Sequence, residues 1–235
     1  MKKETVSCIF CKEKRLYQVS PTQFKCFTCK KKFSLQKYQH EQAIIQAFIA
    51  NQSASSCASS LGLNYATVKK MYQKIRLLLM EYSENIYHQQ THTFSQYDEY
   101  YFLPTCKRKN PHYLFDAIGI LGMVYETHIY TLLLPNQFAH LKHLEEEAIE
   151  KEMYARFLMQ HRVAHYESFE NPLSNFWRYL ERWMEHFKGV KEENFIAYLK
   201  EAEFKFNHKN EEEQRSILEA LWRKAFYMQR SKKQE

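Results

Sequence analysis

The sequence predicts a multi-part α+β protein with a small cysteine-bearing module, a helical region and a region of strands followed by helices. Three observations support this class. Two C-x2-C pairs lie near the N-terminus, apolar residues recur at helical spacing in the next part, and strand-like segments begin at residue 96. At 235 residues the chain can bury a substantial core and form one or two domains.

The first module is defined by Cys8, Cys11, Cys26 and Cys29. Two such pairs can present four thiolates to one tetrahedral Zn²⁺ ion, and four protein ligands leave no open position for a substrate. The sequence therefore predicts a zinc ribbon at residues 1–36 with a structural zinc ion, although the interval between the pairs is slightly short. A redox pair or two disulfides are the alternatives, and the lack of a secretory signal disfavours both.

Positive charge is concentrated in this module. The chain carries a net charge of +7, and residues 1–40 contain ten lysines and arginines against two glutamates. Cys29 leads directly into Lys30, Lys31 and Lys32, a pattern that favours contact with phosphate backbones. A lysine run that only aids solubility is the alternative interpretation.

Residues 37–84 predict a helix-turn-helix domain. Apolar residues indicate a helix from Tyr38 to Asn51, Ser53 can cap a short helix from Ala54 to Ser60, and Gly62 supplies a turn. A longer third helix follows, capped by Asn64. Its expected outer face, suited to groove and phosphate contacts, consists of Asn64, Tyr65, Thr67, Lys69, Lys70 and Lys74. An ordinary three-helix packing unit is the alternative.

A polar linker is expected at residues 85–95, and residues 96–235 predict an α+β domain. The expected strands are Gln96–Phe102, Leu114–Tyr125 and Thr127–Pro135, with a basic loop at Cys106–Pro111 and a short strand at Arg162–His165. The expected helices are Gln137–Met159, Pro172–Phe187, Glu192–Asn207 and Glu211–Met228.

This order of parts resembles bacterial insertion-sequence DDE transposases that carry an N-terminal zinc ribbon and helix-turn-helix. The resemblance covers nearly the whole chain. It is carried by Asp98-Glu99-Tyr100-Tyr101-Phe102, the basic loop Lys107-Arg108-Lys109, Leu134-Pro135-Asn136, His161-Arg162-Val163-Ala164-His165, Ser174-Asn175-Phe176-Trp177 and the segment from Gly189 to Asn207. It implies an RNase H-like catalytic domain, here truncated, with a mixed sheet flanked by helices, and DNA contacts by the basic loop.

The chain departs from the family at the catalytic positions. DDE chemistry uses three carboxylates that hold two divalent ions, and only Asp98 matches. The second aspartate has no counterpart, and Ser174 stands at the third position. The sequence therefore gives Mg²⁺ weak support. Other acids could substitute: Asp116 would lie near Tyr100 if the first two strands form a hairpin about the basic loop, and further candidates are Glu145, Glu146, Glu150, Glu167 and Glu170.

The prediction is therefore a transposase-family protein that binds double-stranded DNA and has impaired or lost strand transfer. One alternative is an active transposase with a rearranged acidic set. Another is a zinc-stabilised protein-interaction module that uses the aromatic C-terminal helices. Because the sequence has no apolar run near the ~20 residues that span a bilayer, we expect no membrane association and a location in the bacterial cytoplasm. The resemblance implies self-association.

Overall fold

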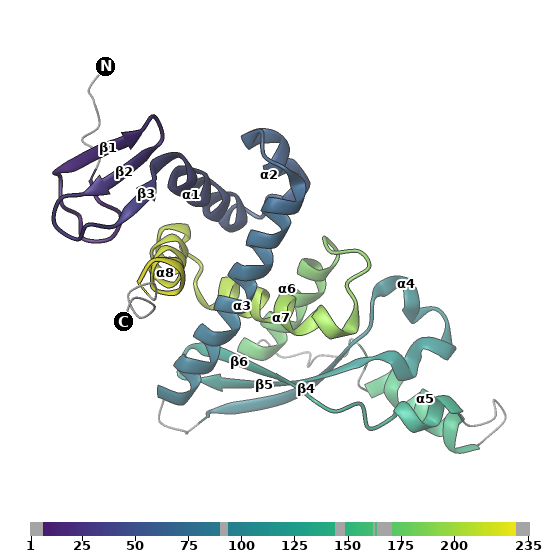
Figure 1. The fold of residues 1–235 in the computed structure, drawn as a ribbon. Helices are drawn as coiled ribbons and strands as arrows, with labels where there is room; N and C mark the ends of the chain where they lie inside the picture. Colours follow the sequence, from purple (N-terminus) through teal and green to yellow (C-terminus); the bar gives the residue numbers. More distant parts are fainter. Residues whose placement is uncertain (1–6, 90–93, 144–148, 162, 164–170, 229–235) are drawn as a thin grey trace. The chain divides into compact units, whose positions relative to one another are not determined.

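The computed structural model describes residues 7–89, 94–143, 149–161, 163 and 171–228. Across these residues the chain is α+β, with two three-stranded sheets and eight α-helices (Figure 1). Residue contacts divide it into two units. The first holds Met1–Leu78 together with Asn210–Glu235, and the second holds Leu79–Lys209. The C-terminal residues thus group with the N-terminal unit rather than with the α+β domain expected at 96–235.

The small sheet of the first unit is antiparallel, with β1 (Leu16–Ser20), β2 (Gln23–Cys26) and β3 (Lys32–Ser34) in chain order. Alternate side chains along a strand point to opposite faces. On one face Leu16, Phe24 and Phe33 pack around the buried Cys8 and Cys26. The other face is open to solvent.

Three helices follow the sheet: α1 (Leu35–Ile49), α2 (Ala54–Leu61) and α3 (Tyr65–Gln89). The predicted caps are confirmed. Ser53 accepts a hydrogen bond from the Ser56 amide at 3.1 Å, and Asn64 accepts one from the Ala66 amide at 2.8 Å. Gly62 ends α2 in the left-handed conformation, with φ of 62°. These caps satisfy amides and carbonyls that a helix end leaves unpaired.

Helix α3 continues to Gln89, five residues into the segment expected to be a linker. The polar composition of residues 85–89 was misleading, because Tyr87 stacks on Tyr130 with ring centroids 4.2 Å apart and also contacts Tyr125. Residues 90–93 of that expected linker lie outside the described residues.

Helix α8 (Glu211–Arg223) packs against α1 within the first unit. The indole N–H of Trp222 donates to the Glu41 carboxylate at 3.0 Å, and the Tyr227 hydroxyl donates to the same oxygen. The α-helix ends five residues before the predicted Met228, and a turn of π-helix (Lys224–Met228) follows it.

The second sheet is an antiparallel meander of β4 (Gln96–Phe102), β5 (Ile118–Tyr125) and β6 (His128–Leu133). The predicted first strand matches β4. The predicted second strand begins later, because a 3-10 helix occupies Pro111–Asp116, and a short helix, α4 (Thr105–Arg108), replaces part of the basic loop.

The register corrects the expected position of Asp116. Asp98 is paired with Gly122, and Phe102 at the far end of β4 is paired with Ile118. Asp116 therefore lies beyond the Phe102 end of the hairpin. It precedes Gly122, the partner of Asp98, by six residues, and Phe102 itself is already four residues, or ~13 Å of strand, from the level of Asp98. Its carboxylate pairs instead with the ammonium groups of Lys142 and Lys107.

Helices α6 (Pro172–Met184) and α7 (Glu192–Asn207) cover the sheet face that carries Tyr100, Ile120 and Val124 (Figure 1). Helix α6 ends three residues before the predicted Phe187. Gly122 allows this packing: a Cβ atom there would lie 2.7 Å from Trp177 and 2.8 Å from Leu173. The absence of a side chain lets α6 approach the sheet closely.

On the opposite face Tyr101 and Leu103 pack with α5 (Ile149–His161) and a 3-10 helix at Ala139–His143. The helix predicted at Gln137–Met159 is therefore two elements, and residues 144–148 between them are not described. Of the strand predicted at 162–165, only Val163 is described. It forms a parallel bridge to Tyr101.

Candidate metal centre and nucleic-acid interface

The four N-terminal cysteines converge. The Sγ atoms of Cys8 and Cys29 are 3.6 Å apart, those of Cys11 and Cys26 are 3.5 Å apart, and all four lie within 4.8 Å of one another. Sulfurs that surround Zn²⁺ tetrahedrally at ~2.3 Å are roughly 3.8 Å apart. The thiols therefore fit a metal ion such as zinc, and they are the only group of three or more potential ligands that converges among the described residues.

The two C-x2-C pairs have the same local backbone. The residue after each pair, Lys12 or Lys30, adopts a positive φ of 62° or 58°. Each turn is closed by a hydrogen bond from the first cysteine: the Cys8 amide donates to the Glu13 carbonyl at 2.8 Å, and the Cys26 amide donates to the Lys31 carbonyl at 3.0 Å. This repetition explains how two separate segments present two thiols each in matching orientation.

The thiols differ in acidity. Burial raises the pKa of Cys8 to about 12 despite hydrogen bonds from backbone amides. Burial also opposes ionisation of Cys26, but hydrogen bonds from the backbone amides of Cys29 and Thr28 and from the Cys11 thiol outweigh it and lower its pKa to about 7. Because thiolates are the metal ligands, the amide hydrogen bonds to Cys26 favour the ionised form that a cation requires.

The three consecutive lysines do not form one cationic patch. The Lys30 ammonium lies 4.5 Å from the centre of the Phe27 ring, whereas the Lys31 ammonium lies 5.0 Å from the centre of the Phe10 ring. Lys32 is exposed on β3, opposite Lys25 of β2. Lys31 thus lies beside a different ring from Lys30, whereas Lys32 is paired with Lys25 across the sheet.

The predicted outer face of α3 is mostly exposed. Tyr65, Thr67, Lys69 and Lys70 are solvent-accessible, and the Lys69 ammonium lies 5.9 Å from the centre of the Tyr65 ring. Asn64 caps the helix, as described above, so its side-chain oxygen is already engaged.

Helix α8 closes one side of this face. The Lys74 ammonium lies 4.9 Å from the centre of the Phe226 ring. Thr67, Lys70 and Lys74 line a hollow of about 540 Å³ together with residues of α1 and with Trp222. The hollow is also lined by Lys37 and by Glu41, so three lysines face one carboxylate there.

The predicted basic loop is partly engaged in packing. The Arg108 guanidinium binds the Glu181 carboxylate and donates to the Leu103 carbonyl at 2.8 Å. Lys107 lies 4.0 Å from the Asp116 carboxylate. Lys109 is exposed.

Asp98 is half-buried and accepts a 2.9 Å hydrogen bond from the indole N–H of Trp177. Ser174 is buried in a reciprocal cap with Asn171 at the start of α6. Glu181 accepts hydrogen bonds from the Tyr100 hydroxyl and from Arg108. Within the described part of the chain, Asp98 belongs to no converging group of three or more potential metal ligands. Glu145, Glu146, Glu167 and Glu170 lie outside the described residues, and Glu150 is exposed.

Comparison with known proteins gives one partial similarity. No family model and no solved structure matches the chain. The chain is 34% identical over 70 residues to a protein of Haemophilus influenzae named uncharacterized transposase-like protein. The similar region is 29% of this chain and 57% of that relative, so the chain spans little more than half of the relative's length. None of the described helices is long and apolar enough to cross a membrane.

Sequence reasoning missed a buried polar network in the second unit. The Lys200 ammonium lies 2.8 Å from the Glu203 carboxylate, which also accepts from the Thr131 amide at 2.8 Å and from the Ser83 hydroxyl. Lys200 also lies 3.8 Å from the centre of the Tyr130 ring. The available signal was an oppositely charged pair, three residues apart, within the predicted helix Glu192–Asn207.

Proposed function

We propose that the chain is a DNA-binding protein of transposase descent whose strand-transfer activity is impaired or lost. The observation that carries this proposal is the capped helix-turn-helix, which joins a four-thiol metal centre in one unit and exposes a lysine-bearing helix face. The partial similarity to a transposase-like protein supports the same descent. Double-stranded DNA is the proposed partner.

Helix α3 supplies the proposed DNA contacts. A helix fits the major groove of B-DNA, and side chains near its N-terminus reach base edges and phosphates. Tyr65, Thr67, Lys69 and Lys70 lie on that first part of α3 and are exposed. Lys30 and Lys32 of the ribbon and Lys109 of the second unit are proposed as additional phosphate contacts.

The metal centre is proposed to be a structural zinc site. Four thiolates satisfy zinc completely and leave no position for water or substrate. Cys8, Cys11, Cys26 and Cys29 would hold the ion and thereby fix both turns of the small sheet. We therefore assign it to scaffolding and propose a zinc ribbon at the start of the chain.

The second unit is proposed to be a truncated RNase H-like domain. An antiparallel meander with one parallel bridge, from Tyr101 to Val163, is consistent with the mixed sheet of that fold. Two-metal DNA chemistry needs several carboxylates at one point, whereas Asp98 has an indole donor as its neighbour. We therefore propose no Mg²⁺ at this position. Bacterial cytoplasm and self-association are proposed on descent alone.

Duplex binding tests the proposal. Full-length, zinc-loaded protein would be titrated into a labelled duplex carrying the gene's own flanking DNA, at several salt concentrations. In the double variant Lys69→Ala/Lys70→Ala, the slope of log affinity against log salt concentration is expected to become shallower by about 1 for each lysine removed. The matched control is Lys188→Ala/Lys191→Ala, two exposed lysines of the second unit. Wild-type protein that ignores duplex DNA at physiological salt would refute DNA binding.

Plasmid nicking separates this proposal from an active transposase. Supercoiled plasmid carrying the same flanking DNA would be incubated with wild type or Asp98→Ala in Mg²⁺ or Mn²⁺. We expect binding without cleavage by either protein. Cleavage that disappears in Asp98→Ala would establish that an acidic set does operate, with acids from outside the described residues as its first suspects.

A further inference from the structure

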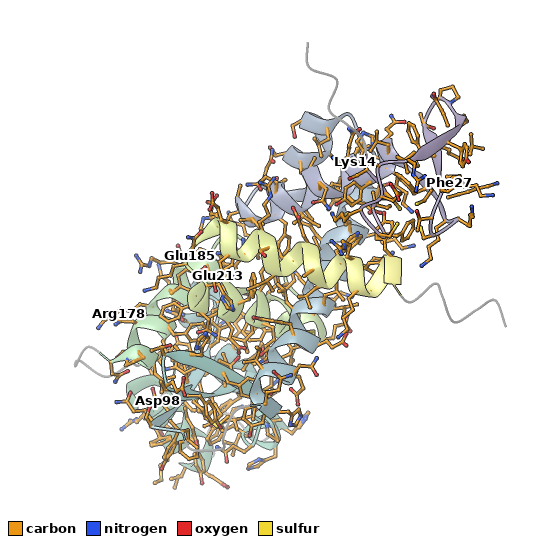
Figure 2. All side chains as sticks on the ribbon, turned by 90° about the vertical axis from the view of Figure 1, so that its left-hand side faces the viewer. Lys14, Phe27, Asp98, Arg178, Glu185 and Glu213 are labelled. Atoms are coloured by element: carbon orange, nitrogen blue, oxygen red, sulfur yellow. The ribbon has the colours of Figure 1, made fainter. Side chains whose placement is uncertain are left out.

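The outer face of the small sheet carries an aromatic pair that no packing role explains. Tyr17 is 53% exposed, and Phe27, just after β2, is 38% exposed. Their ring centroids are 5.8 Å apart at an interplanar angle of 42°. Burial would normally recover the hydrophobic free energy of such rings. Figure 2 labels Phe27 among the side chains of this module.

Cations surround the pair. The Arg15 guanidinium and the Lys30 ammonium lie 4.7 and 4.5 Å from the centre of the Phe27 ring. The strand register sets Tyr17 opposite Lys25, and Lys25 opposite Lys32. Cross-strand partners share a sheet face, so a tyrosine and two lysines form a row across the three strands.

Glu13, an acid beside Arg15, is engaged in a turn. Glu13 lies 3.8 Å from Arg15, but its carboxylate accepts hydrogen bonds from the Lys14 and Arg15 amides and from the Thr28 hydroxyl at 2.8 to 3.1 Å. These hydrogen bonds hold the Glu13 carboxylate in the turn. The face as a whole is cationic and aromatic.

We propose that this face binds unpaired nucleobases of a single-stranded nucleic acid. Bases would stack on Tyr17 and Phe27, and the phosphates between them would pair with Arg15, Lys25, Lys30 and Lys32. Aromatic platforms beside a cationic track are the general means of binding single strands. A duplex covers the faces of its bases, so it could use the cations but not the rings.

This inference deepens the proposed DNA binding, on which it rests for its ligand class, but it concerns a different surface from α3. The two are separable because α3 would contact paired DNA through Lys69 and Lys70. If the protein binds single strands but not the duplex, only the proposed role of α3 in duplex binding fails. Retained duplex binding without single-strand binding would remove this inference only.

The test uses full-length, zinc-loaded protein and fluorescence anisotropy. The probes are an oligothymidylate and an oligouridylate of about 20 nucleotides, enough to cover one small binding module, and a duplex of the same length. Tyr17→Ala is expected to weaken binding of both single strands about tenfold, as expected for loss of one stacking partner, and to leave duplex affinity unchanged. The control is Tyr97→Ala, a tyrosine of β4 that is 69% exposed. If Tyr17→Ala weakens binding of the uridylate alone, the natural ligand is RNA. If it weakens binding of the thymidylate alone, the natural ligand is DNA.

Tyr17→Trp supplies a direct optical readout, because all three native tryptophans lie outside residues 1–36. This variant should retain single-strand affinity, and the added indole fluorescence should be quenched by the oligothymidylate but not by the duplex. The proposal is overturned if no single strand binds, if Tyr17→Ala binds single strands as wild type does, or if it weakens duplex binding equally. Bound zinc, measured in each variant, ensures that an intact module is compared.

Discussion

Replacing Gly122 by alanine should destabilise the second unit, because the new methyl group has no space. Its Cβ would lie 2.7 and 2.8 Å from two ring atoms of Trp177 and 2.8 Å from a methyl of Leu173. Both side chains are buried in the same core, where neither can move away freely. Overpacking of this kind costs about 1–3 kcal/mol, and three simultaneous short contacts place Gly122→Ala in the upper half of that range.

Urea unfolding monitored by tryptophan fluorescence measures this cost, since Trp177 and Trp183 both report on α6. The matched control is Gly119→Ala on the same strand. There the new Cβ would lie 3.1 Å from the Leu134 Cβ and 3.4 Å from the Tyr101 ring, so we expect a cost below about 1 kcal/mol.

A double-mutant cycle with Trp177→Phe tests the cause. Phenylalanine lacks the two indole atoms that the new methyl would meet, although the change also removes the hydrogen bond to Asp98, worth about 1.5–3 kcal/mol for a charged acceptor. Gly122→Ala/Trp177→Phe should therefore be less destabilised than the sum of the two single variants. The close approach of α6 to the sheet would be refuted if Gly122→Ala left the free energy of unfolding unchanged, or if the effects of the two substitutions on that free energy were strictly additive.

Three further predictions concern metal, packing and pH. Cys26→Ser should abolish stoichiometric zinc binding and lower duplex affinity, whereas Cys106→Ser, at an exposed cysteine outside the cluster, should leave both unchanged; elemental analysis and anisotropy measure these outcomes. Trp222→Phe keeps a ring against α1 but removes the donor to the buried Glu41, so the first unit should lose about 1.5–3 kcal/mol in chemical denaturation. A hydrogen bond from Tyr130 lowers the pKa of Glu84 in the folded protein. The contribution of Glu84 to the free energy of unfolding should therefore be present above the ordinary glutamate pKa of about 4.3 and be lost as pH falls through the lower pKa of the folded state. Glu84→Gln should remove that small acid-dependent loss in pH-dependent unfolding.

The local features were predictable because short-range chemistry determines them. The spacing of Cys8, Cys11, Cys26 and Cys29 specifies two matching turns, and the structure brings all four thiols together. Ser53, Gly62 and Asn64 end or begin helices through their own hydrogen bonds and backbone preferences, so each could be placed within a residue or two. Strand β4 and helix α7 have the predicted bounds, since both have strong periodicity and clear ends.

Contacts between residues distant in the sequence were not predictable, because a local sequence pattern does not indicate which distant residue a side chain will contact. The composition of Glu211–Arg223 does not indicate that Trp222 donates to Glu41. The last helix was expected with residues 96–209, whereas its contacts group it with the first unit. Residues 85–89 have the polar composition of a linker, but they are helical in the structure, where Tyr87 stacks on Tyr130. The position of Asp116 depended on where β5 begins, and a 3-10 helix that precedes β5 removed it from the level of Asp98.

Asp98, Ser174 and Glu181 each have a packing role in the second unit. Ser174 caps α6, and Glu181 joins α6 to Tyr100 and Arg108. Asp98 accepts a hydrogen bond from the Trp177 indole, which packs over Gly122, the residue paired with Asp98 on β5. Two-metal chemistry needs several carboxylates that converge, whereas Asp98 belongs to no converging group of three or more potential ligands among the described residues and accepts a hydrogen bond from the Trp177 indole. We infer that this aspartate stabilises the contact between sheet and helix, which gives it a physical role that does not depend on catalysis.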